Sequence, residues 1–388
     1  MRTFDVAIIG GGIIGTSIAF ELAAEKLRVI VLDRQQAGRE ASWAAAGMLS
    51  PSPHRPQDVP LVPFAKESLR IYPEFGAAIE NESGKSICYD CPGLLEIFID
   101  SRGETERDGM IVEHRALGLI VEPISIDEAR RREPELGESA TSAAWLPDEA
   151  TVDPRLLMDA LVTAARLRGA EILSDCGASA LLYDGARCTG VLTSADKIFA
   201  NHVVVAAGCF SGGIALHNSR QTGKTLALSQ YAPTKPVRGQ MLALRPKGKS
   251  IRRVLRSREG YLVPRQDGRV VAGSTLEDAG FEKCVTPGGL SQIISGVRKL
   301  WPAFDEAAIV ETWCGLRPGT PDDLPILGPT DIKGLIIATG HYRNGILLAP
   351  ASARLIREWI TYGKSNFDAQ RFSPLRFLDR QMQRQSAM

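Results

Sequence analysis

The stretch FDVAIIGGGIIGTSIAFEL, residues 4–22, decides how the N-terminal part of the chain folds. It opens with six mostly apolar residues, which predict a buried parallel strand. Gly10, Gly12 and Gly15 follow in the spacing G-x-G-x-x-G. Apolar side chains then recur at every fourth position, at 14, 18 and 22, as on one face of a helix. Residues 28–32 (RVIVL) predict a second strand after that helix.

This succession of strand, glycine turn and helix has the layout of a dinucleotide-binding site. Gly10 permits the tight turn, Gly12 lets the backbone approach a pyrophosphate, and Gly15 lets helix and strand pack closely. Free N–H groups at the start of the helix favour the phosphate charge. Asp33 follows the second strand, where a carboxylate accepts hydrogen bonds from the adenosine ribose. That acid favours FAD or NAD over NADP, although the adjacent Arg34 would suit a 2′-phosphate.

Three further segments bear on which dinucleotide binds, a question that the glycine motif leaves open. Residues 39–51 (REASWAAAGMLSP) are rich in small side chains, which would let the backbone lie flat against a ring system; a loop with the helical propensity of its alanines is the alternative. Residues 202–208 (HVVVAAG) predict a buried strand that ends in small residues. Residues 334–350 (GLIIATGHYRNGILLAP) predict a strand, a loop and an apolar helix, whose start would stabilise negative charge on a ring.

Composition and charge exclude several classes of protein. At about 150 residues per domain, 388 residues predict two or three domains. With 44% hydrophobic and 23% charged residues, the chain is globular rather than disordered. Its 46 basic and 45 acidic residues give no footprint for nucleic acid or an anionic membrane. The sequence contains no apolar run long enough for a membrane span, and glycines interrupt what would otherwise resemble an N-terminal signal peptide.

The seven cysteines are scattered along the chain. An odd, unpatterned number favours a reducing compartment over a disulfide framework, so we expect a cytoplasmic protein. Cys88 and Cys91 form a C-x-x-C pair, but no second pair completes the four ligands of a structural zinc site. The sequence therefore predicts no metal.

Five motifs together resemble the D-amino-acid oxidase family of FAD-dependent oxidoreductases, and within it the glycine oxidases of the thiamine pathway. They are the glycine unit at 10–15, AAAGM at 44–48, VVVAAG at 203–208, GLRP at 315–318 and GHYRNGILL at 340–348. The resemblance runs from about residue 4 to residue 363. It implies an α/β fold with a glutathione-reductase-like FAD-binding Rossmann domain. A second, α+β substrate domain would be built on a mixed or antiparallel sheet.

These segments divide into two interrupted domains. FAD binding is expected from residues 1–50, 145–215 and 330–365, and substrate binding from residues 51–144 and 216–329. Within the latter, residues 252–273 alternate apolar runs with turns, as in an antiparallel meander. Residues 215–236 are longer and more polar than the family's connection, which predicts a mobile surface loop; a cover for the active site or a role in assembly is the alternative. Residues 366–388 lie outside the family pattern and predict a frayed C-terminal extension.

The glycine motif and the resemblance together place the FAD contacts. They are expected at Gly10, Gly12, Ile13, Ile14, Gly15, Asp33, Arg34, Ser42, Ala45, Ala46, Gly47, Met48, Ala178, Ala207, Gly208, Arg343, Asn344, Gly345 and Ile346. A relative within the family attaches FAD covalently to a cysteine, and that position aligns with Gly315 rather than with Cys314. Because neighbouring strand residues point to opposite faces of a sheet, we expect noncovalent FAD.

Arg317 is the central candidate on the substrate side. It lies among uncharged residues, where a buried arginine needs a partner anion, and local sequence alone favours a structural salt bridge. The resemblance implies instead that Arg317 forms a two-pronged pair with the substrate carboxylate, a geometry that suits the planar guanidinium. It also implies that Tyr261 donates its hydroxyl to this carboxylate and that Arg343 lies beside it. Met48 and Leu276 would be walls of a small substrate pocket.

The resemblance implies oxidative deamination of glycine and other small amines, such as sarcosine and small D-amino acids, to the imine and 2-oxo acid. FAD would take the hydride and O2 would become H2O2, with a link to thiamine biosynthesis. A homo-oligomer, as in the homotetrameric relatives, is implied as well. Two alternatives stay open: a D-amino-acid dehydrogenase that passes electrons to a quinone, and a noncatalytic FAD-binding protein. The sequence shows no basic amphipathic helix for membrane docking, which disfavours the quinone-linked dehydrogenase.

Overall fold

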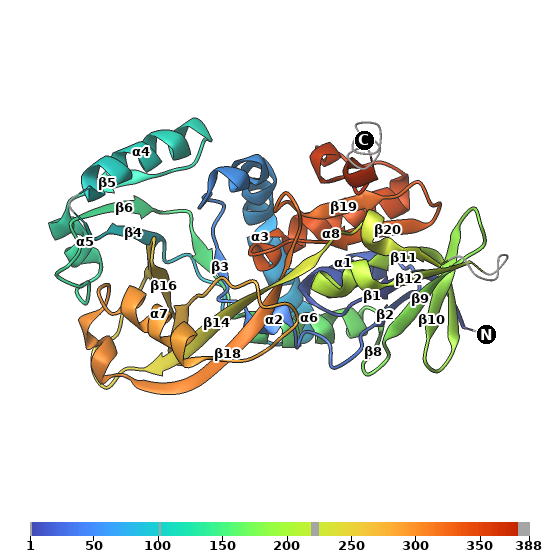
Figure 1. Cartoon of the computed structure of the whole chain (residues 1–388), viewed down its shortest axis with the longest axis horizontal. Helices are drawn as coiled ribbons and strands as arrows, with labels where there is room; N and C mark the ends of the chain where they lie inside the picture. Colours follow the sequence, from blue (N-terminus) through green and yellow to red (C-terminus); the bar gives the residue numbers. More distant parts are fainter. Residues whose placement is uncertain (1, 101, 219–224, 379–388) are drawn as a thin grey trace.

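A computed structural model describes residues 2–100, 102–218 and 225–378. Its larger sheet is built around parallel strands in the order β8, β2, β1, β11 and β20 (Figure 1). Their bounds are Glu171–Leu173, Val29–Leu32, Arg2–Ile9, Lys197–Val205 and Leu335–Thr339. The strands expected at 4–9, 28–32 and 202–208 are therefore confirmed. They lie side by side at the centre of the sheet, although β11 is far from β1 in the sequence.

Helices cover one face of this sheet and share a hydrophobic core with it. They are α1 (Ile13–Ala24), α3 (Val62–Ser83), α6 (Pro154–Leu167) and α8 (Gly345–Tyr362). Helix α1 begins directly after the glycine turn, as predicted, and Ile18 and Leu22 of its four-residue spacing are fully buried. None of the helices in the described part of the chain has the length and apolar character that a membrane crossing needs.

Beyond β11 the sheet continues as an antiparallel extension. Strand β10 (Cys188–Thr193) pairs with β11, and β9 (Ala178–Tyr183) pairs with β10. Strands β12 (Ala215–Asn218) and β13 (Thr225–Ala227) then form an outer hairpin beside β9. The expectation of a mobile surface loop at 215–236 is wrong for the part that the structure describes, because β9 supplies backbone partners and Leu228 and Ala232 are fully buried. Residues 219–224 lie outside the described residues.

The second sheet has the strand order β18, β14, β17, β16, β15, β4, β6 and β5. The bounds are, in that order, Ala308–Gly319, Lys235–Arg245, Val270–Gly273, Gly260–Pro264, Val254–Ser257, Leu94–Phe98, Ser142–Leu146 and Glu122–Ile124. Strands β15, β16 and β17 are the predicted meander. Helices α4 (Gly103–Ala116), α5 (Ile126–Arg132) and α7 (Pro287–Val297) accompany this sheet, and β14 and β18 reach from it toward the larger one (Figure 1). The predicted α/β class with a second mixed sheet is thereby confirmed.

The positions of several elements refine the division into two domains, which remains a proposal. Helix α3 packs with α8 in the core of the larger sheet, because its apolar face includes the buried Ile71, Tyr72 and Phe75. Strands β12, β13 and β19 (Ile326–Pro329) also belong to the larger sheet. From the sequence, α3, β12, β13 and β19 are instead expected in the substrate domain. We propose the larger sheet and its helices as the FAD-binding domain, with these elements included.

The chain after α8 packs against the larger sheet instead of fraying. Phe372 and Phe377 are 1% and 6% exposed, each within one of the two cores that flank this sheet. Arg376 Nε lies 3.0 Å from Asp322 Oδ2, and this ion pair fixes the segment further. The expectation of a frayed extension is therefore wrong for residues 366–378, because aromatic burial holds them in place. Residues 379–388 lie outside the described residues.

Candidate active site

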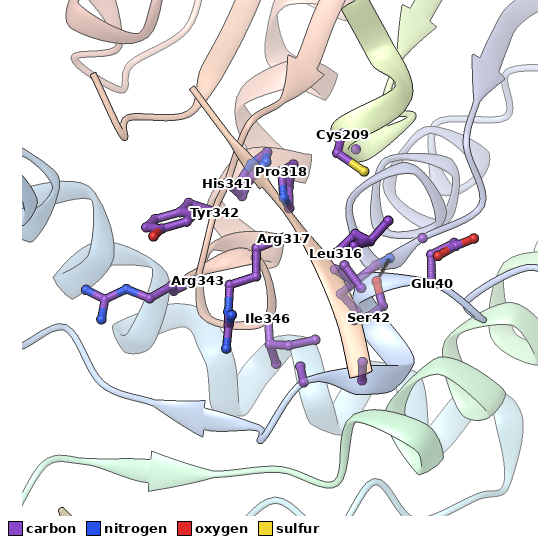
Figure 2. A pocket seen from close by; sticks show the side chains of 18 of the residues that line it. Glu40, Ser42, Cys209, Leu316, Arg317, Pro318, His341, Tyr342, Arg343 and Ile346 are labelled. Atoms are coloured by element: carbon purple, nitrogen blue, oxygen red, sulfur yellow. Dashed lines mark hydrogen bonds between the residues drawn. The ribbon is translucent and has the colours of Figure 1, made fainter. Parts of the chain in front are cut away.

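A cavity of about 430 Å³ lies where the carboxyl ends of β1, β2, β11 and β20 meet strands β14, β16 and β18 of the second sheet. Ligands of open α/β sheets bind at such carboxyl ends. Figure 2 shows side chains of β18, among them Leu316 and Arg317, close to Ser42 and Ile346 of the other half. The cavity is therefore shared between the two sheets.

The glycine turn has the conformation that the motif predicts. Gly10 has φ +104°, and a Cβ atom there would overlap the carbonyl of Ala206 at the end of β11. A Cβ atom on Gly15 would overlap the carbonyl oxygen of Gly10, so glycine alone lets α1 approach the strand this closely. At the start of α1, the N–H of Ile13 donates to Ser42 Oγ at 2.9 Å. The turn and the first turn of α1 thus line the cavity with closely packed backbone.

Asp33 stands at the end of β2 and faces the glycine turn. Its Oδ2 accepts a hydrogen bond from the N–H of Gly11 at 2.7 Å, and its Oδ1 accepts one from the N–H of Gln35 at 3.0 Å. Burial raises the pKa of Asp33, and the two backbone hydrogen bonds oppose that rise. The neighbouring Arg34 donates to Glu40 at 2.6 Å, so its charge is compensated within the protein.

These features fit the FAD that the sequence predicts. Gly10 and Gly12 line the cavity without side chains, as the approach of a pyrophosphate requires, and Asp33 offers carboxylate oxygens for a ribose. A Cβ atom on Gly47 would overlap the carbonyl of Val152, so this stretch also depends on glycine for its close packing. Gly315 lines the cavity, whereas Cys314 pairs with Gln240 one step along the strand and so faces the other side of the sheet.

Arg317 points from β18 into the cavity (Figure 2). Its Nη2 donates to Ser274 Oγ at 2.7 Å, and its Nη1 donates to the carbonyl of Thr275 at 3.2 Å. A Cβ atom on Gly239 of β14 would overlap the guanidinium, so the side chain occupies space that only glycine leaves open. None of the ion pairs among the described residues includes Arg317. The structural salt bridge that local sequence favours is therefore absent from the described part of the chain.

The other predicted substrate residues line the same cavity at different depths. Tyr261 of β16 donates its hydroxyl to Met241 Sδ at 3.3 Å, which is a weak acceptor. Met48 belongs to the short strand β3 (Met48–Leu49) and is partly buried in the cavity wall. Leu276 is 55% exposed, so it lines the mouth of the cavity rather than its interior.

Arg343 lines the same cavity but is already paired. Its Nη2 donates to Asp58 Oδ2 at 2.7 Å, and Asp58 also binds Arg55 at 3.0 Å. In Figure 2 the Arg343 side chain extends away from Arg317. Burial lowers the pKa of Arg343, while Asp58 opposes that effect. The sequence predicts the place of Arg343 but not the carboxylate that compensates it.

The structure brings nearly all of the predicted site residues to one cavity. The residues that line it are Gly10, Gly12, Ile13, Ile14, Asp33, Arg34, Ser42, Ala45, Ala46, Gly47, Met48, Ala178, Ala207, Gly208, Tyr261, Leu276, Arg317, Arg343, Asn344, Gly345 and Ile346. Gly15 lies behind this wall and acts through the packing of α1 on the turn. Their roles toward a cofactor or substrate remain proposals.

A buried polar cluster at the second sheet is not evident from the sequence. Arg256, which is 2% exposed, donates to Glu96, and its Nη1 also donates to Ser50 Oγ at 2.9 Å. His54 lies 3.4 Å from the same Nη1 and lines the cavity. The pairing of β15 with β16 in the meander puts Arg256 opposite Tyr261. No local sequence pattern shows that Glu96 of β4 lies on the other side of Arg256.

His341 shows that a histidine in a motif need not carry chemistry. It is buried, and its Nε2 lies 2.9 Å from Ser352 Oγ of α8. Burial lowers the pKa of His341 to about 3, so the ring is neutral at physiological pH. His341 therefore lines the cavity as a neutral, packed side chain.

Comparison with known proteins agrees with this geometry. A family model described as FAD dependent oxidoreductase (DAO) matches residues 5–359. The chain is 36% identical to the bifunctional protein ThiO/ThiG of Synechocystis sp. over 97% of this chain and 54% of that protein. It thus spans about half the length of the first curated relatives that it matches.

Other relatives match over their whole length. The chain is 31% identical to the glycine oxidase of Pseudomonas putida, over 95% of this chain and 98% of that protein. The crystal structure of glycine oxidase from Geobacillus kaustophilus matches with a TM-score of 0.87 and 29% identity, over 96% of this chain and 98% of that chain. The chain therefore belongs to the DAO family of FAD-dependent oxidoreductases.

Proposed function

We propose that this protein is an FAD-dependent oxidase of glycine and other small amines, including sarcosine and small D-amino acids. The amine is oxidised to the imine while O2 is reduced to H2O2, and water then hydrolyses the imine to the 2-oxo acid and free ammonia or amine. The observation that carries this proposal is the guanidinium of Arg317, which enters the cavity of the glycine turn without a carboxylate partner among the described residues. The names of the relatives support glycine as substrate and a link to thiamine biosynthesis.

The substrate carboxylate is the anion that suits Arg317. A guanidinium binds a carboxylate through two parallel N–H groups, and the charges strengthen both hydrogen bonds. Within the described ranges the hydroxyl of Tyr261 donates to a thioether sulfur alone, so a carboxylate oxygen would be a better acceptor for it. Together these two groups would fix the position of the substrate α-carbon, which is the proximity effect that this reaction needs.

FAD held by the glycine turn and Asp33 would supply the redox chemistry, which is the two-electron oxidation of the amine with O2 as the final acceptor. The chain's own residues need no general acid or base for this step. A substrate amine inside the cavity loses water contacts, and desolvation favours its neutral form. Arg343 adds little net charge to this end of the cavity, because Asp58 pairs with it while Asp323 pairs with the neighbouring Arg55. The preference for the neutral amine therefore rests on desolvation rather than on a second free cation.

The size of the substrate follows from the walls of the cavity. Met48 and Met241 narrow the interior near Tyr261, and Leu276 lies at the mouth. These apolar side chains would tolerate a methyl group on the nitrogen or the α-carbon but would exclude a large side chain. Glycine, sarcosine and D-alanine are therefore the first substrates to test.

The decisive experiment is an absorbance spectrum of the FAD-loaded protein before and after anaerobic mixing with glycine, sarcosine, D-alanine and D-proline. Bleaching of the flavin band, followed by recovery and peroxide formation under air, is the expected result. Reduction of a quinone or dye without peroxide would indicate the dehydrogenase instead. An unbleached flavin with every amine would favour a noncatalytic FAD-binding protein and would reject the proposal.

Three further properties belong to this proposal. FAD is held noncovalently, because Gly315 rather than Cys314 lines the cavity, and acid precipitation should release all yellow colour from the protein. The seven free cysteines favour a reducing compartment such as the cytoplasm. We also propose a homo-oligomer, which light scattering of the purified protein would measure.

A further inference from the structure

The loop between β17 and α7, residues 274–286, contacts both halves of the cavity, and we call it the strap. It begins at the substrate end, where Ser274, Thr275 and Leu276 line the cavity. It ends at Thr286, whose side chain caps α7 by accepting from the N–H of Gly289 at 3.1 Å. Much of its surface faces solvent, so its position depends on a limited number of contacts.

At its first residues the strap holds Arg317. Ser274 Oγ accepts from Nη2 at 2.7 Å, and the carbonyl of Thr275 accepts from Nη1 at 3.2 Å. Both acceptors are uncharged, so they orient the guanidinium without neutralising it. The positive charge of Arg317 stays available to an anion in the cavity. The strap fixes the direction in which its two Nη groups point.

The middle of the strap lies beside β14 and is bound by Arg238 and Gln240, whose side chains do not line the cavity. Arg238 Nη2 donates to Glu277 Oε2 at 2.6 Å, and the backbones of these two residues exchange hydrogen bonds at 2.9 Å. Gln240 Nε2 donates to Glu277 Oε1 at 2.8 Å and to Thr286 Oγ1 at 3.0 Å. The strap is therefore hydrogen-bonded to β14 at both Glu277 and Thr286.

Farther along, the strap crosses to the dinucleotide half of the cavity. The Phe281 ring stacks on Phe210 with centroids 5.0 Å apart, and the guanidinium of Arg34 lies 3.6 Å from the centroid of the Phe210 ring. Lys283 Nζ lies 3.0 Å from Glu40 Oε2, and Arg34 also binds Glu40. Phe210, Arg34 and Glu40 all line the cavity.

We propose that the strap positions Arg317 for carboxylate binding and that Ser274 is the positioning residue. Phe281 and Lys283 fasten the strap to the dinucleotide half, so contacts there set the geometry at Arg317. This inference deepens the proposed function, on which it rests for the identity of the anion. It does not depend on turnover, because it concerns only the binding of a carboxylate.

Acetate is the probe that tests the strap, because it carries the carboxylate of glycine without the amine and is not oxidised. Its dissociation constant is measured from the change that it causes in the absorbance spectrum of the FAD-loaded protein. Ser274→Ala should weaken acetate binding by about tenfold, since one hydrogen bond to a charged group is lost. Ser274→Thr keeps a hydroxyl and should restore most of the affinity.

The far end of the strap gives the sharper test, because its residues do not touch Arg317. The double variant Phe281→Ala/Lys283→Ala should weaken acetate binding by about threefold, since it removes an aromatic stack and an exposed ion pair. Combined with Ser274→Ala, its effect should be less than multiplicative, because both changes release the same loop. Asp278→Ala is the matched control, since this exposed strap residue makes only a 4.0 Å ion pair with Lys235 among the described residues.

Two results would overturn the strap proposal. If the far-end variants bind acetate as tightly as Asp278→Ala does, the strap does not fix the orientation of the Arg317 guanidinium. A wild-type protein that binds no acetate would refute the proposal as well. Glycine reduction of the wild-type flavin separates the two proposals. A flavin that glycine does not bleach rejects the proposed function, but coupled losses of acetate affinity in the same protein would still support the strap.

Discussion

Replacement of Arg317 by alanine tests the main proposal of substrate binding. The guanidinium is half-buried and has two uncharged hydrogen-bond partners and no carboxylate among the described residues, so its charge is left for the substrate. Removal of one partner of a buried charge pair costs about 2–5 kcal/mol. Because the side chain is only half-buried, we expect about 2–3 kcal/mol, which is roughly a 30- to 150-fold increase in the dissociation constant for glycine. Anaerobic stopped-flow reduction at several glycine concentrations measures this constant apart from the limiting rate.

Two further variants make the result specific. Arg317→Lys keeps the positive charge but not the two-pronged geometry, so its loss of affinity should lie between those of the wild type and the alanine variant. Arg245→Ala removes an exposed arginine at the other end of the sheet and should leave glycine binding unchanged. An Arg317→Ala protein that kept the wild-type kcat/KM for glycine would refute the reasoning.

Three other predictions concern stability and the cofactor. Gly15→Ala should abolish FAD retention and lower Tm, because the added methyl group overlaps the backbone of the preceding turn. Gly109→Ala lies on the open surface of a helix and should stabilise the protein by about 0.5–1 kcal/mol. Flavin absorbance and melting curves check both variants. Glu96→Ala should cost about 3 kcal/mol in urea unfolding, because the buried Arg256 loses the carboxylate to which it donates and keeps Ser50 and the nearby charge of Glu149, and an unchanged midpoint would contradict this. His341, with its pKa lowered to about 3, binds a proton more weakly in the folded state than in the unfolded state, so stability is lost as pH falls from about 6.5 toward 3. Between pH 7 and pH 4.5 this effect should lower the free energy of unfolding of the wild type by on the order of 3 kcal/mol, and His341→Asn should not show that decrease. Urea titrations of both proteins at the two pH values measure it.

The sequence determines the dinucleotide-binding half to a large extent. The spacing of Gly10, Gly12 and Gly15, the strand before them and Asp33 after the next strand all lie within one short stretch. Their packing is local, since a side chain on Gly15 would meet the carbonyl of Gly10 in the preceding turn. Backbone constraints of this kind leave a direct trace in residue type, and the structure has the predicted turn, helix and strands.

The substrate half is predicted in part, because family motifs identify residues but not their partners. Arg317 and Tyr261 reach the cavity as the resemblance implies. The loop expected at 215–236 is instead a hairpin in its described part, since polar residues in a segment do not reveal that an open sheet edge will pair with it. The charge of Arg343 is likewise compensated by Asp58, which is 285 positions away.

Only the tertiary structure decides which charges are free and which are held. Arg317 and Arg343 are the same residue type in neighbouring motifs, yet one meets a hydroxyl and a carbonyl and the other meets a carboxylate. The strap joins Ser274 to the dinucleotide half through contacts between segments that are remote in sequence. Periodicity and glycine spacing record constraints between near neighbours in the chain. An ion pair or a ring stack forms where the fold brings two segments that are distant in the sequence close together. Such a contact leaves no pattern in the sequence around either residue.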